Sequence, residues 1–349
     1  MTDEMLKIGL PAGSLANPKR GGNLVQLLED AGFRTSGYEA GGPSQITTSN
    51  FIYAWDGRPQ EFGSQLGIGE LDVAIGGDDW VRERILELQL EYNTEVALEK
   101  VLSLKRGGVK IVGIVKDDHP AQSIEEFLKV VTSSHDIITL VSEMPYLAVE
   151  WIQSKLKKLG LYEEYSKFSV QKYKTPPRIN KGIVIYETWG KTEAKIKNGG
   201  ADIGLEITQT GGAIRNYGLK IIETVMESEA GIWIHPLIKK NPQKLDLLKM
   251  FLLNLYGTIN AEQKVLLLFN VANENTGEIE EYLKDNNLYA DEPTINRGTH
   301  FTEYSVQVET DNKENPLAKI RYDLAIRKAK SIDTVPLQSS IPNLEVLQL

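Results

Sequence analysis

The segment 201–214 (ADIGLEITQTGGAI) joins a run typical of a buried strand to a turn built on Gly211 and Gly212. Glycine lets the backbone approach a ligand closely, and successive N–H groups where a helix begins can hold an anion such as phosphate. The hydroxyls of Thr208 and Thr210 add donors, and Glu206 could accept hydrogen bonds from ribose hydroxyls or help to hold magnesium. The bare pattern also fits an ordinary turn. The acidic residue and the threonines around it favour a phosphate site.

A second candidate is the segment 69–78 (GELDVAIGGD), in which a strand ends in Gly76, Gly77 and Asp78. Ligands of open α/β sheets bind at the carboxyl ends of the strands, so this position suits a binding site. The structural alternative is a tight strand-to-helix turn with Asp78 or Asp79 as the N-cap. The first strand also ends in a glycine, at 13–14 (GS), so three such strand ends could converge on one cleft.

Other familiar chemistries lack their motifs. The sequence has no cysteine, which excludes disulfides, thiolate nucleophiles and Cys-ligated metal centres. The four histidines, at 119, 135, 235 and 300, show no metal-binding spacing. The nucleotide-binding patterns GxxxxGK[ST] and GxGxxG and the hydrolase pattern GxSxG are absent as well.

The charge balance argues against nucleic acid as a partner. The 349 residues include 39 Lys and Arg against 48 Asp and Glu, a net charge of −9, whereas nucleic-acid proteins present a basic surface. The acidic N-terminal residues do not resemble a signal peptide, and no apolar run approaches the ~20 residues that span a bilayer. We therefore expect a soluble, cytoplasmic protein without a membrane partner.

Strands and helices alternate over the first 260 residues, which predicts α/β architecture with mainly parallel sheets. In the first part, strands are expected at 6–10 and 71–75, with helices at 23–31 and 79–90. In the second part, strands are expected at 109–115, 137–141, 202–207 and 221–225, with helices at 123–131 and 147–159. The polar, Pro-rich stretch 172–181 predicts an exposed loop, and 242–255 a further helix.

The pattern changes after Gln263. Strands are expected at 265–271, 302–309 and 332–336, and helices at 278–286 and 317–330. With one more strand around 293–295, this order is the ferredoxin-like βαββαβ arrangement. Such modules often bind a regulatory ligand or pair with copies of themselves.

Several short segments occur in a fixed order along the chain: 8–15 (IGLPAGSL), 27–33 (LLEDAGF), 58–62 (RPQEF), 69–78, 142–145 (SEMP), 201–219 and 228–234 (SEAGIWI). In this order, and together with the C-terminal module, they resemble the long form of ATP phosphoribosyltransferase, the first enzyme of histidine biosynthesis. The order of many matches is more specific than any one of them.

The resemblance implies an α/β fold with a two-lobed, periplasmic-binding-protein-like catalytic region and a C-terminal ferredoxin-like (ACT-like) α+β regulatory domain. It places lobe I at 1–105 plus 226–260, and lobe II at 106–225. The regulatory domain would occupy 261–349. The loop for phosphoribosyl pyrophosphate (PRPP) would lie in lobe II.

The implied activity is that of a glycosyltransferase, which moves the phosphoribosyl group of PRPP to N1 of ATP and releases pyrophosphate. The resemblance also implies Mg²⁺ as cofactor, histidine as feedback effector and a hexameric homo-oligomer. Such a reaction needs positioning and charge stabilisation more than a nucleophilic side chain, so the missing cysteine and triad are no objection.

The site residues follow from the matched motifs. Glu206 would be catalytic and would ligate the metal. The PRPP-binding residues would be Glu206, Thr208, Gln209, Thr210, Gly211, Gly212 and Ala213. The nucleotide-binding residues would be Leu10, Gly13, Ser14, Arg58, Gly76, Gly77, Asp78, Lys110 and Glu143.

Some positions depart from the family pattern. Ala12 stands where a basic residue is usual, and Ala213 replaces the last hydroxyl of the PRPP loop. The tail 338–349 extends beyond the usual end. The alternatives are therefore a diverged phosphoribosyltransferase-like protein with another acceptor or donor, and a non-catalytic ligand sensor of the same fold.

Overall fold

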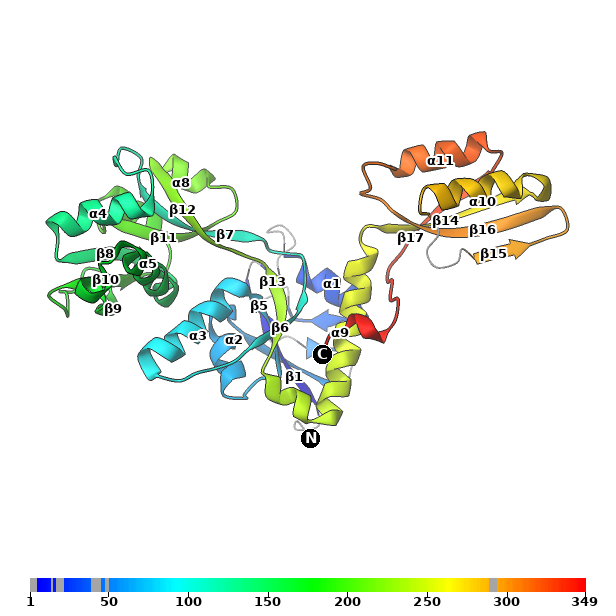
Figure 1. Cartoon of the computed structure of the whole chain (residues 1–349). Coiled ribbons are helices and arrows are strands. Elements are labelled where there is room, and N and C mark those ends of the chain that lie inside the picture. Colours follow the sequence, from blue (N-terminus) through cyan, green and yellow to red (C-terminus); the bar gives the residue numbers. More distant parts are fainter. Residues whose placement is uncertain (1–4, 14, 17–21, 39–44, 48–49, 289–293) are drawn as a thin grey trace. The chain divides into compact units, whose positions relative to one another are not determined.

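A computed structural model describes residues 5–13, 15–16, 22–38, 45–47, 50–288 and 294–349 (Figure 1). Contacts divide the chain into two compact units. Residues 1–25, 35–248 and 349 form the first, and residues 26–34 and 249–348 form the second. The first unit contains two large sheets, and each is the centre of one lobe.

The sheet of lobe I has the strand order β4-β1-β5-β13-β6. Its strands are β1 (Leu6–Pro11), β4 (Ile52–Gly57), β5 (Val73–Gly77), β6 (Glu99–Ser103) and β13 (Ala230–Ile234). The strand β1 runs parallel to β4 and β5, whereas β13 is antiparallel to β5 and β6. The hairpin of β2 (Thr35–Ser36) and β3 (Gln45–Ile46) and the helices α2 (Pro59–Gly67) and α3 (Asp78–Tyr92) complete this lobe.

The sheet of lobe II has the order β12-β7-β11-β8-β10-β9. Its strands are β7 (Val109–Lys116), β8 (Ile137–Ser142), β9 (Phe168–Lys172), β10 (Gly182–Glu187), β11 (Ile203–Thr208) and β12 (Leu219–Ser228). Its helices are α4 (Ile124–Ser134), α5 (Pro145–Leu159), α6 (Tyr162–Tyr165), α7 (Thr192–Lys197) and α8 (Gly212–Asn216). The strand β7 is antiparallel to both neighbours, and the remaining pairs are parallel.

Local sequence explains where the two long helices of lobe II begin and end. In α4, Ser123 Oγ accepts the Glu126 N–H, and the Glu126 carboxylate accepts the Gln122 N–H. This is a capping arrangement close to the capping box. In α5, Pro145 occupies the first turn, and Gly160 ends the helix in the left-handed region at φ +71°.

The chain passes between the two sheets of the first unit twice. The first passage is the segment 104–108 between β6 and β7, and the second is the short step at 229 between β12 and β13. Two lobes joined by two such passages form the architecture expected for the catalytic region. The expected fold class is confirmed in this part.

The second unit holds a four-stranded antiparallel sheet of order β15-β16-β14-β17. The elements are β14 (Lys264–Ala272), α10 (Thr276–Asp285), β15 (Thr294–Arg297), β16 (Phe301–Glu309), α11 (Leu317–Ile326) and β17 (Lys330–Pro336). This is the ferredoxin-like order, and the extra strand expected near 293–295 is present as β15. The core gathers Phe269 and Tyr304, whose rings stack, with Ile279, Leu283 and Leu324.

The helices α1 (Leu24–Asp30) and α9 (Pro242–Ala261) and the short turns η3 (Pro236–Lys240), η4 (Asn273–Asn275) and η5 (Leu344–Val346) complete the description. The C-terminal tail packs on α9 within the second unit. Ser340 N–H donates to the Gly257 carbonyl over 2.9 Å, and a Cβ on Gly257 would lie 2.4 Å from Ser339 Oγ. None of the described helices is both long and apolar enough to cross a membrane.

Some sequence expectations differ from the structure. The predicted helix 317–330 ends at Ile326, because Lys328 is left-handed (φ +66°) and β17 begins at Lys330. The sheets are mixed rather than mainly parallel, since β13, β7 and β12 run against their neighbours. The strands β4, β6, β9 and β10 and the helices α2, α6 and α7 were not expected from the sequence.

Candidate active site

A cavity of about 400 Å³ lies where strand ends of both sheets of the first unit meet. Its walls are formed by Ala12, Gly13, Leu15, Arg58, Pro59, Gln60, Gly77, Asp79, Trp80, Gly107, Val109, Ile207, Gln209, Ser228 and Ala230. Arg58 is the one cation in this set, and it pairs with no carboxylate in the part of the chain that the structure describes. A cavity of this size with few, convergent polar groups is typical of a small-molecule site.

The first turn of α3 forms one wall of this cavity. The Asp79 side chain is only 4% exposed, and its backbone N–H donates to Ser228 Oγ over 3.1 Å. A Cβ on Gly77 would lie 2.2 Å from Asp79 Oδ1, so the glycine makes room for the carboxylate. Because the Asp79 side chain is buried, its pKa is raised, and a ligand that donates a hydrogen bond to the carboxylate would stabilise its charged form.

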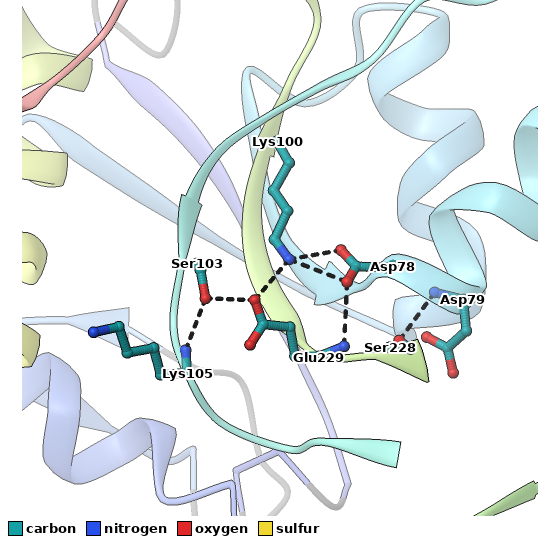
Figure 2. Close-up of polar contacts among 7 residues, drawn as sticks. All are labelled: Asp78, Asp79, Lys100, Ser103, Lys105, Ser228 and Glu229. Carbon is teal, nitrogen blue, oxygen red and sulfur yellow. Dashed lines mark hydrogen bonds and ion pairs between the residues drawn. The ribbon is translucent and has the colours of Figure 1, made fainter. Parts of the chain in front are cut away.

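The neighbouring Asp78 belongs to an ion-pair network at the second passage between the lobes (Figure 2). Lys100 Nζ lies 2.9 Å from Asp78 Oδ1 and 3.1 Å from Glu229 Oε1. Ser103 Oγ donates to Glu229 over 2.5 Å, and the Glu229 N–H donates to Asp78 Oδ2 over 3.2 Å. Burial alone would lower the pKa of Lys100, but these two carboxylates raise it. These contacts hold Glu229, where the chain crosses between the lobes, against Asp78 in the first turn of α3.

The loop 208–212 links β11 to α8 and is closed by its own threonines. Thr208 Oγ1 accepts the Gly211 N–H over 2.9 Å, and Thr210 Oγ1 accepts the Gly212 N–H over 3.4 Å. Gly211 is left-handed at φ +71°, a conformation that suits glycine. The Arg215 guanidinium donates to the Thr210 carbonyl and thereby covers the loop from α8.

Glu206 lies on β11 in a partly buried acidic environment. Burial, together with the charges of Glu193 and Glu143, raises its pKa to about 7. The Ile207 N–H donates to Glu206 Oε1 over 2.9 Å and opposes this shift. Glu143, in the turn before α5, also has a raised pKa because of burial. A cation placed beside these carboxylates would be strongly attracted, because burial reduces the screening of their negative charge by water.

The structure brings only some of the predicted site residues together. Gly13, Arg58, Gly77 and Gln209 line the cavity described above. Lys110 and Gln209 line an adjoining cavity of about 340 Å³, in which Lys110 pairs with Glu227 over 3.2 Å. Ser14 lies outside the described residues.

The other predicted residues do not line the main cavity. Leu10 is fully buried in β1, Gly76 is buried in β5, and Asp78 is bound in the network of Figure 2. Glu206, Thr208 and the residues 210–213 lie along β11, the loop and α8, and Glu143 precedes α5. Glu143 and Glu206 are close enough for the charge of Glu143 to act on Glu206.

Among the polar and aromatic residues that line the cavity, four were not assigned a binding role from the sequence, namely Gln60, Asp79, Trp80 and Ser228. A signal was available for Asp79, because it follows Gly76-Gly77-Asp78 directly. Ser228 begins the matched segment 228–234, but nothing in the sequence indicated that it contacts Asp79, from which it is separated by 149 residues along the chain. Within the described residues, no group of three His, Asp or Glu side chains is arranged to hold a metal by itself.

A two-lobed α/β region with a polar cavity lined from both sheets is the arrangement of a protein that binds or converts a small molecule. The sequence profile of the ATP phosphoribosyltransferase family matches residues 58–254, more than half of the chain. The chain therefore belongs to the ATP phosphoribosyltransferase family, a family of glycosyltransferase enzymes of histidine biosynthesis.

Curated relatives match over nearly the whole length. An ATP phosphoribosyltransferase of Geotalea uraniireducens is 26% identical over 348 residues, which cover 97% of this chain and 99% of the relative. An ATP phosphoribosyltransferase 1 of Geobacter sulfurreducens is 26% identical and covers the same shares. Among solved structures, an ATP phosphoribosyl transferase complex from Thermotoga maritima has a TM-score of 0.48 and 14% identity, covering 72% of this chain and 98% of that one.

Proposed function

We propose that this chain transfers the phosphoribosyl group of PRPP to N1 of ATP, with release of pyrophosphate. The family membership supports the reaction class. The observation that carries the proposal is the cavity lined by Arg58, Asp79 and Gln209, because its walls combine predicted nucleotide-binding residues of lobe I with one residue, Gln209, of the predicted PRPP loop of lobe II.

In this proposal the nucleotide lies against lobe I. Arg58 supplies the positive charge for its phosphates, and Gly13 and Gly77 leave space for close backbone approach. The dry carboxylate of Asp79 accepts hydrogen bonds from base or ribose donors, and Trp80 provides an apolar wall. Gly76 supports this edge from within β5, and Leu10 from within β1.

PRPP lies at lobe II, with its 5′-phosphate on the loop 208–213. The N–H groups of Gly211 and Gly212, which the threonine hydroxyls now satisfy, can turn to phosphate oxygens, because a charged acceptor is the stronger one. The hydroxyls of Thr208 and Thr210 are then free to donate to the same phosphate. Gln209 reaches the cavity and orients the ribose.

Glu206 is the proposed residue for the ribose hydroxyls and for a magnesium ion. Burial and the charges of Glu193 and Glu143 raise the pKa of Glu206, so a cation beside it would favour its ionised form, although no three acidic side chains of the described residues are arranged to hold a metal by themselves. Bound magnesium would stabilise the charge of the leaving pyrophosphate. Since PRPP itself can supply most of the oxygen ligands, one or two carboxylates from the protein are sufficient.

The proposed reaction depends mainly on how the two substrates are positioned relative to each other. N1 of the adenine must face C1′ of the ribose while the bond to pyrophosphate breaks and positive charge develops on the ribose ring. Two lobes that each bind one substrate supply this alignment, and the carboxylate of Glu206 stabilises the developing positive charge. The other nucleotide-edge residues predicted from the sequence, Lys110 and Glu143, lie near the second substrate in this arrangement.

We further propose lobe I at 1–105 with 226–260, lobe II at 106–225, and a regulatory domain at 261–349 that binds histidine. The hexameric state and the cytoplasmic location stay predictions. The ferredoxin-like topology of the second unit supports a regulatory role, because such modules often bind small effectors.

A second candidate is a transferase with another acceptor or another phosphorylated donor. Ala12 favours it, because this neutral residue lines the cavity where a family member usually carries a cation. With Arg58 as the one cation among the described lining residues, the cavity offers little charge for two polyphosphates. A protein that only binds a ligand, without converting it, would also need few cationic residues in this cavity.

The test is a coupled pyrophosphate-release assay with PRPP, magnesium and a panel of acceptors. Release that requires ATP and no other acceptor supports the first proposal. Release that requires a different base supports the second. Folded protein that binds ligand in a thermal-shift experiment without releasing pyrophosphate from any pair would identify a sensor.

A further inference from the structure

The helix α5 in lobe II is not capped by a side chain from its own N-terminal segment. Met144, at the N-cap position, makes no side-chain hydrogen bond to the helix, and Pro145 has no N–H. The next two N–H groups, of Tyr146 and Leu147, are therefore donors without partners inside the helix. The contrast is α4, where the local Ser123 caps the helix.

Glu83 of α3, in lobe I, supplies the missing acceptor. Its Oε1 accepts the Tyr146 N–H over 3.0 Å, and its Oε2 accepts the Leu147 N–H over 2.7 Å. Both oxygens of one carboxylate thus bind the first turn of a helix that belongs to the other lobe. Its negative charge also lies at the positive end of the helix dipole of α5.

This contact is enclosed in protein. The Glu83 side chain is 3% exposed, and burial raises its pKa to about 7. On α3 the positive charge of Arg84 opposes this shift, and the negative charge of Glu87 adds to it. On α5 the titratable neighbour is the phenol of Tyr146.

The same face of α3 reaches the candidate active site one turn earlier. Asp79 precedes Glu83 by four residues, so the two buried carboxylates point the same way from the helix. Asp79 lines the cavity and holds Ser228 at the end of β12, and Glu83 holds the start of α5. The helix α3 thereby contacts the last residue of β12 and the first turn of α5, two elements packed around the same sheet.

A surface contact between the same two helices offers a comparison. Arg82 of α3 pairs with Glu150 of α5, and their side chains are 45% and 39% exposed. Exposed ion pairs contribute little to stability, whereas a buried carboxylate that satisfies two helix donors leaves both unsatisfied when it is removed. The two contacts join the same elements and differ in burial.

We propose that Glu83 is a positioning residue that latches lobe I to lobe II by capping α5 across the lobe boundary. The ionised carboxylate accepts both N–H groups and holds the lobes in one arrangement. Protonation of Glu83 removes one of the two acceptors and weakens the hold of lobe I on lobe II. The latch is a property of the free protein, and only its bearing on turnover rests on the proposed function.

The absence of cysteine allows a direct test, because introduced cysteines are the only labelling sites. Spin labels at Ile68→Cys in lobe I and Val130→Cys in lobe II, both exposed positions, report the distance between the lobes. At pH 8 we expect one narrow distance distribution in the parent protein and in Glu150→Gln. We expect a clearly broader one in Glu83→Gln, with its melting temperature recorded to establish folding.

The pH profile separates a latch from a merely structural role. The parent distribution should broaden as the pH falls from 8 to 5.5, whereas the Glu83→Gln distribution should stay the same. Amide exchange at Tyr146 and Leu147 should be at least tenfold faster in Glu83→Gln than in Glu150→Gln.

An unchanged distance distribution in folded Glu83→Gln, or equal amide exchange in both variants, would overturn the latch. If the parent protein forms no phosphoribosyl product, the proposed function fails, but these measurements still decide the latch because they need no substrate.

Discussion

The backbone N–H of Asp79 donates a hydrogen bond to the Ser228 hydroxyl over 3.1 Å, so the first turn of α3 is tied to the last residue of β12. Next to this contact the Asp79 carboxylate occupies the space beside Gly77. One wall of the cavity thus depends on Gly77, which leaves space for the Asp79 carboxylate, and on Ser228, which is 149 residues from Asp79 in the sequence.

Gly77→Ala should disturb that wall. The new Cβ would lie 2.2 Å from Asp79 Oδ1, so the carboxylate must move. We expect nucleotide affinity, measured by titration calorimetry, to fall at least tenfold, and the free energy of unfolding to fall by about 1–3 kcal/mol. Gly277→Ala on α10 is the control, because a Cβ there meets no atom within 4 Å and the residue lines neither cavity. Equal nucleotide binding by both variants would remove Asp79 from the site.

Gly211→Ala tests the predicted phosphate loop. Gly211 has φ +71°, so alanine there is strained by about 1–2 kcal/mol and lowers the melting temperature. Gly218→Ala carries the same strain at φ +70°, in open space after α8. We expect similar melting temperatures without ligand, but loss of PRPP-induced stabilisation in Gly211→Ala alone. Thr210→Ala should be milder. If Gly211→Ala is stabilised by PRPP as strongly as Gly218→Ala, the loop is an ordinary turn.

Glu206→Gln should change how stability depends on pH. The folded pKa of about 7 exceeds the ordinary value of 4.5, so between these pH values the folded state keeps a proton that the unfolded state has lost. The native protein should therefore lose stability as pH rises from 4.5 to 7. Relative to native protein, Glu206→Gln should become more stable by up to about 2–3 kcal/mol at pH 8 and by little at pH 4.5.

Urea unfolding at several pH values measures this difference, and any contribution of Glu83 cancels between native protein and variant. Glu227→Gln is the control, since its side chain is 74% exposed and its pairing with Lys110 is a surface contact. A pH-independent difference for Glu206→Gln would show that this carboxyl group titrates normally.

Lys100→Met should destabilise the passage between the lobes. Lys100 lies between the carboxylates of Asp78 and Glu229, and its removal leaves two partly buried negative charges near each other. We expect a loss of about 1–3 kcal/mol in urea unfolding. Lys239→Met, which removes a more exposed pair with Glu99, should lose less than about 0.5 kcal/mol. Equal losses would mean that the network of Figure 2 has no special role.

The fold was largely predictable because its signals are local. Glycine-ended strands, amphipathic helices such as 147–159 and the βαββαβ order after Gln263 follow from periodicity and turn residues. The strand β4 was missed because Ile52–Gly57 is half exposed and has no clean alternation. The helix α2 was missed because its run PQEFGSQLG includes an internal glycine.

The site was harder to predict because it depends on helix rotation and long-range contacts. Asp78 and Asp79 are adjacent, and about 100° of helix rotation sends one toward Lys100 and the other into the cavity. Sequence alone offers no way to choose between them. The same holds for Glu83, whose partners lie 63 and 64 residues away and are backbone groups without a sequence signature.

The most direct test of the central claim is mass spectrometry of the product formed by the purified, folded chain with PRPP, ATP and magnesium. The account predicts a product with the mass of ATP plus one phosphoribosyl group, formed in equal amount to the released pyrophosphate and absent when PRPP is left out. ATP recovered unchanged at high protein concentration, from protein that PRPP and ATP each stabilise thermally, would contradict it.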